Sequence, residues 1–198
     1  MQFARSTASH NPTPIQVQSD EQLMLAYGQG EIQAFSQLYT KHKDPLWRFF
    51  IRRGMPTDCA EELMQEVWQR VIQSAAHYQA NARFTTWLYQ IARNLLIDKH
   101  RLAHRQFKLV TEHFDDEDCS ANEPEQLVQS ARQAQKLRKC LAKLPALQLD
   151  TFLLKEEAGL KLDQIAQVMD SAVEACKSRM RYAVANLIAC LGKHGEKS

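Results

Sequence analysis

The segment 84–102, FTTWLYQIARNLLIDKHRL, places apolar and polar side chains with the period of an α-helix. Its apolar members recur about every 3.6 residues and would form one face of an amphipathic helix: Phe84, Trp87, Leu88, Ile91 and Leu95. The opposite face carries hydroxyl, amide and basic groups: Thr86, Gln90, Arg93, Asn94 and Arg101. Such a helix must pack its apolar face against other elements, and its polar face suits a polyanion.

Aromatic residues are concentrated just before and within this segment. Phe84 and Trp87 have helical spacing, so we interpret them first as core residues. Tyr78 and Arg83 lie instead in the polar stretch SAAHYQANAR, where we expect a loop. Aromatic faces bind unpaired bases and basic groups bind phosphates. The loop is therefore a candidate site for single-stranded nucleic acid.

The same helical period recurs along most of the chain, and no stretch shows the alternation that is typical of a β-strand. Ser19 and Gln22 form a candidate capping box for a first helix that would end near Gly28 and Gly30. We expect the pattern to pause at Pro45 and to resume after it. The expected helices cover 19–30, 32–39, 46–54, 58–74, 84–102, 131–143, 147–157, 160–169 and 176–187. The predicted fold class is all-α.

Two of these helices, 160–169 and 176–187, are joined by a tight turn at 170–173. Short helices with such a connection fit a helix-turn-helix, whose second helix would enter the major groove of DNA. Several polar side chains of that second helix lie away from its apolar face: Lys177, Ser178, Arg179 and Arg181. A plain helical hairpin is the alternative interpretation.

The net charge of +2 conceals an uneven distribution of charge along the chain. Residues 93–108 contain five Lys or Arg and one acid, whereas residues 109–126 contain seven acids and no Lys or Arg. Like charges repel and extend a chain, so the acidic block predicts a flexible linker between two small helical domains.

The cysteines and the hydropathy of the chain indicate in which compartment the protein works and which kinds of site it can contain. The five cysteines are odd in number, widely spaced and lack a C-x-x-C pair, so we expect reduced thiols and no metal site. No apolar run is long enough to span a bilayer, and the N-terminus has no apolar signal region. We expect a cytoplasmic protein with no membrane insertion, no cofactor, no catalytic residues and no enzymatic activity.

Several motifs together resemble one family, the extracytoplasmic-function (ECF, group IV) sigma factors of bacterial RNA polymerase. In the first half, AFSQLYTKHKDPLWRFF, EELMQEVWQRV and ARFTTWLYQIARNLLIDKHR are similar to sigma region 2. In the second half, LRKCLAKLPALQLDTFLLKEEAGLKLDQIAQVM and CKSRMRYA are similar to sigma region 4. The resemblance implies a tail at 1–18, region 2 at 19–106, a linker at 107–130, region 4 at 131–192 and a tail at 193–198.

The resemblance also implies a function and three sets of contacts. The chain would bind core polymerase, at the β′ coiled coil and the β flap, and direct promoter-specific initiation of transcription in a stress response. Region 2 would melt and read the −10 element through Tyr78, Asn81, Arg83, Thr86, Arg93 and Asn94. Region 4 would read −35 DNA through Glu174, Lys177, Ser178, Arg179 and Arg181. Core polymerase would contact Glu62, Gln65, Glu66 and Gln69. Promoter DNA and an anti-sigma factor are the other implied partners.

Region 4 departs from the family pattern. Glu174, Ala175 and Cys176 stand where the family usually has Gly-Thr-Val, and the apolar stretch YAVANLIACL replaces a basic tail. Fewer cations predict weaker phosphate binding. The apolar stretch would pack on region 4, bind an anti-sigma factor, or close the chain onto its own region 2. The alternative function is a stand-alone helix-turn-helix regulator of transcription, which would bind duplex DNA without polymerase.

Overall fold

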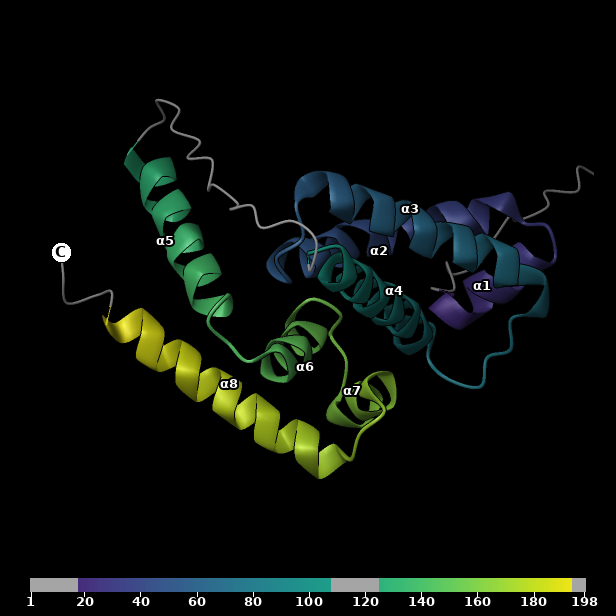
Figure 1. Ribbon diagram of the computed structural model, residues 1–198. Coiled ribbons are helices and arrows are strands. Elements are labelled where there is room, and N and C mark those ends of the chain that lie inside the picture. The colour runs from purple at the N-terminus through teal and green to yellow at the C-terminus, as the bar shows by residue number, and fades with distance from the viewer. Residues whose placement is uncertain (1–17, 108–124, 194–198) are drawn as a thin grey trace, which may run out of the picture.

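The computed structural model describes residues 18–107 and 125–193, and within them the fold is all-α, as predicted (Figure 1). Side chains are described for 18–102 and 133–192. The described elements are α1 (Asp20–Gly28), α2 (Ile32–Arg52), α3 (Thr57–Ser74), the short 3₁₀ helix η1 (Ala75–His77), α4 (Phe84–Phe107), α5 (Glu125–Leu141), α6 (Ala146–Glu156), α7 (Leu162–Met169) and α8 (Val173–Lys193). Within these residues no helix is both long and apolar enough to cross a bilayer.

Helices α1 to α4 form the first helical group, and the apolar faces predicted from the sequence meet at its centre. Leu38, Phe50, Val67 and Leu88 are fully buried there and come from three different helices. Phe84 is also fully buried, as its helical spacing predicted. Side chains of this kind each contribute about 1.5–3 kcal/mol when removed from water, so the packed faces hold the four helices together.

Some helix boundaries differ from the sequence-based expectation. The capping box of Ser19 and Gln22 is present and α1 ends at Gly28, as predicted. Pro45 does not interrupt α2, because buried residues on both sides of it, Leu38 and Phe49 among them, hold the whole helix against the core. Helix α5 begins at Glu125, inside the segment that we expected to be linker. The rest of that acidic segment, 108–124, lies outside the described residues.

Helices α5 to α8 form the second helical group, which contains the predicted helix-turn-helix. Helix α7 ends at Asp170, whose φ of 47° is left-handed, and the backbone N–H of Ser171 donates to Ala166 O. These features close a tight turn that leads into α8. In the apolar stretch of α8, Leu187 is 5% exposed and packs in the core, whereas Ile188 is 67% exposed.

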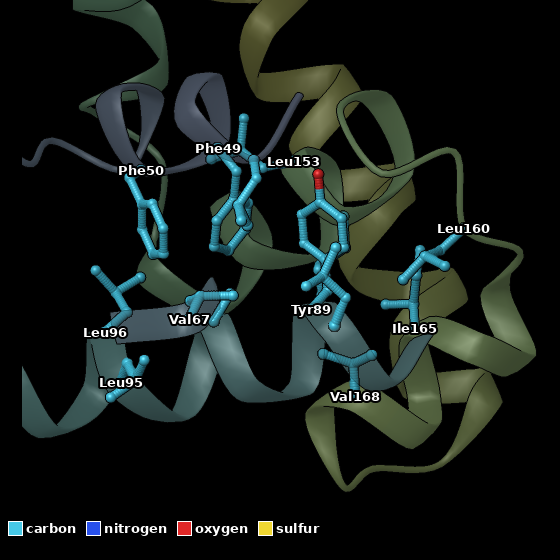
Figure 2. Packing of buried hydrophobic residues seen from close by; sticks show 14 of the residues in the cluster. Phe49, Phe50, Val67, Tyr89, Leu95, Leu96, Leu153, Leu160, Ile165 and Val168 are labelled. Carbon is cyan, nitrogen blue, oxygen red and sulfur yellow. The ribbon is translucent and has the colours of Figure 1, made fainter. Parts of the chain in front are cut away.

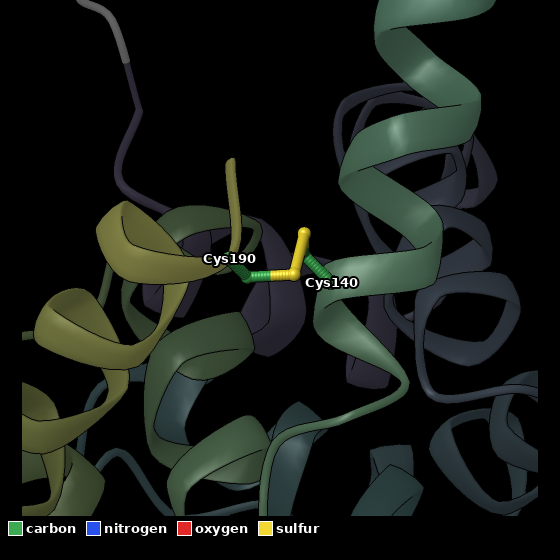
Figure 3. The surroundings of a disulfide bond; sticks show 2 residues. All are labelled: Cys140 and Cys190. Atoms are coloured by element: carbon green, nitrogen blue, oxygen red, sulfur yellow. A yellow bond between two sulfur atoms is a disulfide. The ribbon is translucent and has the colours of Figure 1, made fainter. Parts of the chain in front are cut away.

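A disulfide joins α5 to α8, which corrects the expectation of reduced thiols (Figure 3). Cys140 and Cys190 are 50 residues apart in sequence, but helix packing brings their Cα atoms to 5.8 Å. The spacing of the cysteines in the sequence does not reveal such a pair, because disulfide formation depends on how two distant helices cross. Among the described residues Cys59 and Cys176 are free, and Cys119 lies outside them.

The two helical groups pack against each other, mainly through α4 with α7 and α2 with α6. Figure 2 shows Tyr89 of α4 next to Phe49 of α2, with Ile165 and Val168 of α7 close by. All four side chains are buried, so the apolar core continues from one group into the other. The structure is therefore closed. The apolar stretch of α8, which we had considered as the closing element, is not part of the main contact.

We predict that reduction of the disulfide lowers the free energy of unfolding by about 2–4 kcal/mol, because a cross-link restricts the unfolded chain. Chemical denaturation with and without dithiothreitol measures the difference. The double variant Cys140→Ser, Cys190→Ser is the control and should not respond to the reductant. Equal stability of the parent chain in both buffers would contradict this link between α5 and α8.

Candidate nucleic-acid and polymerase interface

The loop between η1 and α4 opens onto a surface pocket of about 470 Å³. The end of α3, the loop and the first turn of α4 line it: Gln73, Ser74, His77, Tyr78, Gln79, Asn81, Ala82 and Trp87. Amide, imidazole and phenol groups can bond to the edge of a base, and aromatic rings can stack on its face. Its volume is within the usual range for small-ligand sites, so one extruded base fits.

The aromatic rings of Tyr78 and Trp87 line this pocket, and the buried ring of Phe84 contacts Tyr78 from the core. The centroid of Tyr78 lies 5.2 Å from that of Trp87 and 6.4 Å from that of Phe84. Burial and the nearby carboxylates of Glu21 and Asp20 raise the pKa of Tyr78 to about 12. Its hydroxyl, which has no hydrogen-bond partner among the described residues, therefore stays protonated at neutral pH.

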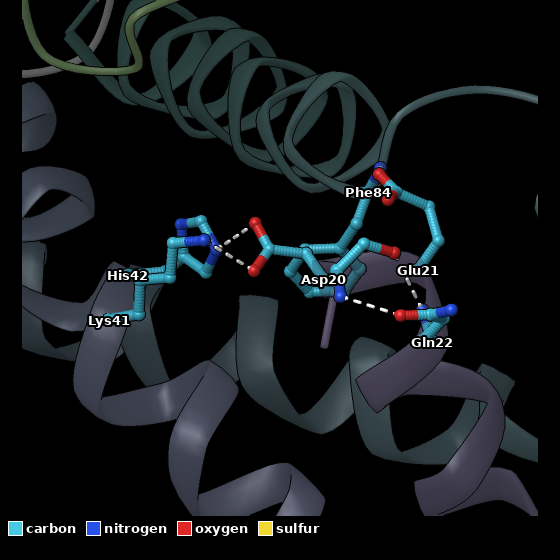
Figure 4. Close-up of polar contacts among 7 residues, drawn as sticks. Asp20, Glu21, Gln22, Lys41, His42 and Phe84 are labelled. Atoms are coloured by element: carbon cyan, nitrogen blue, oxygen red, sulfur yellow. Dashed lines mark hydrogen bonds and ion pairs between the residues drawn. The ribbon is translucent and has the colours of Figure 1, made fainter. Parts of the chain in front are cut away.

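Helix α1 carries two acids that were not predicted as site residues, one in contact with α2 and the other with the start of α4 (Figure 4). Asp20 Oδ1 accepts from Lys41 Nζ at 2.6 Å, and Asp20 Oδ2 lies 3.0 Å from His42 Nε2. Glu21 Oε1 accepts from the backbone N–H of Phe84 at 2.8 Å. Acids in a first helical turn ordinarily indicate only an interaction with the helix dipole, so these distant contacts could not be predicted from the sequence.

The residues predicted to bind −10 DNA divide into three groups. Asn81 and Arg83 are exposed on the loop beside the half-buried Tyr78, as expected for a binding surface. The prediction that Thr86 lies on an exposed polar face of α4 is wrong, because its side chain is 3% exposed and faces the protein interior. The first turn of α4 is covered by α1 as well as by the core, so its second face is not free.

Arg93 and Asn94 lie farther along α4, away from the residues that line the pocket. Asn94 is exposed, whereas Arg93 Nε points toward α6 and lies 3.7 Å from Asp150 Oδ2. In the closed structure Arg93 therefore forms an ion pair with a carboxylate of the second helical group. It can meet a phosphate only after that carboxylate has moved away.

Four arginines of the first group surround two carboxylates of the second. Arg53 Nε donates to Asp150 Oδ1 at 2.5 Å, on the side opposite Arg93. Arg48 Nε donates to Glu157 Oε2 at 2.8 Å, and Arg52 also pairs with Glu157. The side chains of Asp150 and Glu157 are 6% and 4% exposed, so both carboxylates are largely removed from water.

The predicted −35 surface lies at the start of α8. Lys177 Nζ donates to Glu174 Oε1 at 2.6 Å, so the unusual acid is paired within its own helix. Arg179 Nη1 donates to Ser171 Oγ at 3.1 Å, and the Arg181 guanidinium lies 5.1 Å from the Tyr182 ring centre. Ser178 is exposed. All five predicted side chains are on one accessible end of the helix-turn-helix.

The predicted polymerase-binding face is the exposed side of α3, formed by Glu62, Gln65, Glu66 and Gln69. Glu62 Oε2 accepts from Lys99 Nζ at 2.6 Å, which raises the pKa of Lys99. Glu66 Oε1 accepts from Arg70 at 2.7 Å. Exposed pairs of this kind contribute about 0–1 kcal/mol, so a basic partner can replace them readily.

Comparison with known families gives two matches that together cover both helical groups. The profile described as Sigma-70 region 2 matches residues 38–106, and the one described as Sigma-70, region 4 matches residues 134–187. The first match contains the pocket, and the second contains the helix-turn-helix. Helix α1 lies outside both.

Curated relatives carry the same family description. The chain is 30% identical over 159 residues to the ECF RNA polymerase sigma factor SigL of Mycobacterium tuberculosis, covering 80% of this chain and 89% of the relative. It is 26% identical to the ECF RNA polymerase sigma factor SigW of Bacillus subtilis, over 76% of this chain and 85% of that relative. It is also 26% identical to SigE of Mycolicibacterium smegmatis, covering 86% of this chain but 66% of that relative.

Solved structures share the fold. CnrH, determined in complex with the cytosolic domain of CnrY, gives a TM-score of 0.66 at 21% identity and covers 89% of this chain and 99% of that one. The sigma factor RpoE of Bartonella quintana was determined in complex with the anti-sigma factor NepR. It gives a TM-score of 0.66 at 21% identity and covers 81% of this chain and 98% of that one. With both halves matched in sequence and a relative at 30% identity, the chain belongs to the ECF family of RNA polymerase sigma factors.

Proposed function

We propose that this chain binds core RNA polymerase and directs it to promoters, reading −10 DNA with the loop 78–83 and −35 DNA with the start of α8. The observation that supports the proposal is that one chain presents two surfaces suited to two different forms of DNA. A pocket lined by aromatic and amide groups suits an unpaired base, whereas an exposed helix after a tight turn suits duplex DNA.

Base capture at the pocket accounts for the −10 function. Extruding a base costs a few kcal/mol, and stacking on an aromatic side chain contributes about 1–3 kcal/mol per base. Tyr78 and Trp87 supply the rings, and the exposed amide of Asn81 can read the base edge. Arg83 then lies beside the pocket for the strand backbone. Recognition and melting would come from the same contacts.

Family membership favours a polymerase subunit over a stand-alone regulator, and the polar face of α3 supports this choice. That face is exposed and acidic, and it is matched by the region 2 profile. A basic surface on the β′ coiled coil is its expected partner. The chain would supply DNA recognition and no catalytic residue. Because CnrH and the Bartonella sigma factor were each solved with a protein partner, we extend the proposal to an anti-sigma factor.

The proposed function requires the closed structure to open. The centres of the −35 and −10 elements are about 25 base pairs apart, which is roughly 85 Å at 3.4 Å per base pair. Helix α7 of the helix-turn-helix packs directly on α4, whose first turn borders the pocket. The two surfaces cannot reach both elements in this arrangement, so the helical groups must separate on the promoter.

We predict that the chain gives core polymerase defined start sites on a promoter library, because it supplies the DNA recognition that core polymerase lacks. Replacing residues 78–83 by the loop of another family member should change the preferred −10 bases and leave the −35 preference intact. Sequencing of the transcripts measures both. Tight duplex binding by the chain alone, with no effect on polymerase, would instead support the stand-alone regulator.

We predict that Glu66→Lys weakens association with core polymerase by about tenfold or more, since placing like charges against each other costs several kcal/mol. Glu31→Lys makes the same charge change at the exposed residue that precedes α2 and serves as the control. Pull-down titrations of both variants measure the effect. The polymerase face is placed wrongly if the two variants bind equally well.

We predict that Glu157→Gln opens the free chain, because Arg48 and Arg52 lose the charge that holds them to the second group. The radius of gyration from small-angle scattering should increase, and should increase further as salt screens the remaining pairs. Glu156→Gln changes an exposed neighbouring acid and is the control. A radius that is the same in parent, variant and control at every salt concentration would contradict the role of these pairs.

A further inference from the structure

We propose that helix α1 positions the base-binding loop by holding both of its ends, through Gly28 before the loop and Glu21 after it. The inference rests on the proposed function of the loop and assigns the geometry of the pocket to residues outside it. The matched region 2 segment, 38–106, does not include α1.

Glu21 fixes the end of the loop by capping α4. The first backbone N–H groups of a helix lack partners within the helix, and a side-chain acceptor before the helix usually satisfies one. Arg83 occupies that place here, and a guanidinium has no acceptor. Glu21 Oε1 supplies the missing acceptor to Phe84 N at 2.8 Å from a different helix.

The Glu21 carboxylate is charged when it does so. Burial is the largest single influence and opposes ionisation, but the hydrogen bonds from the backbone of Phe84, from its own backbone and from Ser19 together outweigh it and lower the pKa of Glu21 below its ordinary value. A negative charge at the N-terminus of α4 also interacts favourably with the helix dipole. The contact therefore defines where α4 begins, and so where the loop ends.

Gly28 fixes the start of the loop by close approach. A Cβ atom at this position would lie 2.5 Å from the carbonyl oxygen of Ala75, the first residue of η1. That separation is far below van der Waals contact, and the obstacle is backbone that cannot rotate away. The last residue of α1 must be glycine for η1 to lie where it does, directly before Tyr78.

Helix α1 can hold the loop because it is itself fixed to the core. Leu23 and Met24 are buried, and the Asp20 carboxylate receives hydrogen bonds from both Lys41 and His42 of α2. Burial opposes the charge on Asp20, but these bonds prevail and lower its pKa. The His42 ring in turn lies 5.4 Å from the ring of Phe84. A closed set of contacts thus joins α1, α2 and the start of α4 (Figure 4).

The loop between these two anchors has little structure of its own. The backbone hydrogen bonds described within it are short-range, from Tyr78 N to Ala75 O and from Asn81 N to Gln79 O. The positions of Tyr78 and Asn81 relative to Trp87 therefore depend on where the ends are held. A shift of either end would misplace the pocket wall against a bound base while leaving the helical core intact.

The test uses the full-length chain with core polymerase on a promoter library randomised at both the −10 and the −35 element. Base preference at the captured −10 position is the readout, and the −35 preference in the same library is the internal reference. Glu21→Ala removes the cap, and Glu21→Gln restores an acceptor for Phe84 N. Glu31→Ala and Gly192→Ala are matched controls at an exposed acid and at a glycine with open space around it.

We expect Glu21→Ala and Gly28→Ala to reduce the −10 base preference about fivefold, the equilibrium effect of losing one helix cap, with an unchanged −35 preference. Glu21→Gln should remain within about twofold of the parent, because it loses only the charge interaction with the helix dipole. The controls should match the parent. Thermal unfolding of each variant verifies that it is folded. If Glu21→Ala does not fold, the result for Gly28→Ala decides the outcome.

The inference is overturned if the −10 preference survives in Gly28→Ala and Glu21→Ala, or if −10 and −35 preferences fall together, as a general loss of structure would cause. It is equally overturned if Glu21→Gln behaves like Glu21→Ala. A parent chain that shows no base preference with polymerase contradicts the proposed function itself. The two failures are therefore distinguishable within one experiment.

Discussion

Two carboxylates of the second helical group, Asp150 and Glu157, are almost fully removed from water between arginines of the first. Desolvating a carboxylate costs several kcal/mol, which such pairs recover only with good geometry and additional hydrogen bonds. Their contribution lies more in orientation than in net stability. Each carboxylate meets two arginines, so the pairs select one face of α6 against α2 and α4, and the apolar contact around Tyr89 then forms in that register.

This arrangement links the fold to DNA recognition through Arg93. The side chain is on the helix that borders the base pocket, yet Asp150 occupies it in the closed structure. Separation of the two groups would return Arg93, Arg53 and their neighbours to solvent, where a phosphate can replace a carboxylate with the same donor geometry. The closed structure thus pairs these arginines internally, and opening would make them available together with both proposed DNA-binding surfaces.

Most of the helices and the family could be predicted from the sequence, because they depend on local periodicity and on contiguous motifs. Much of the buried face of α3 and α4 follows from the 3.6-residue period, although Ile72 is exposed and the buried Tyr89 was not expected on that face. The contacts that the sequence did not reveal are all long-range. The Cys140–Cys190 disulfide, the cap of α4 by Glu21 and the burial of Thr86 depend on how separate helices meet. The wrong expectation at Pro45 arose because tertiary packing outweighed a local preference.

We infer that one chain holds its two proposed DNA-binding surfaces together when free and apart on a promoter. Energy transfer between dyes at Asp44 and Lys155 tests it most directly, since both residues are exposed and come from different helical groups. We expect efficient transfer in the free chain and near loss of transfer in the complex with core polymerase and promoter DNA. The same efficient transfer in a complex that initiates transcription would contradict it.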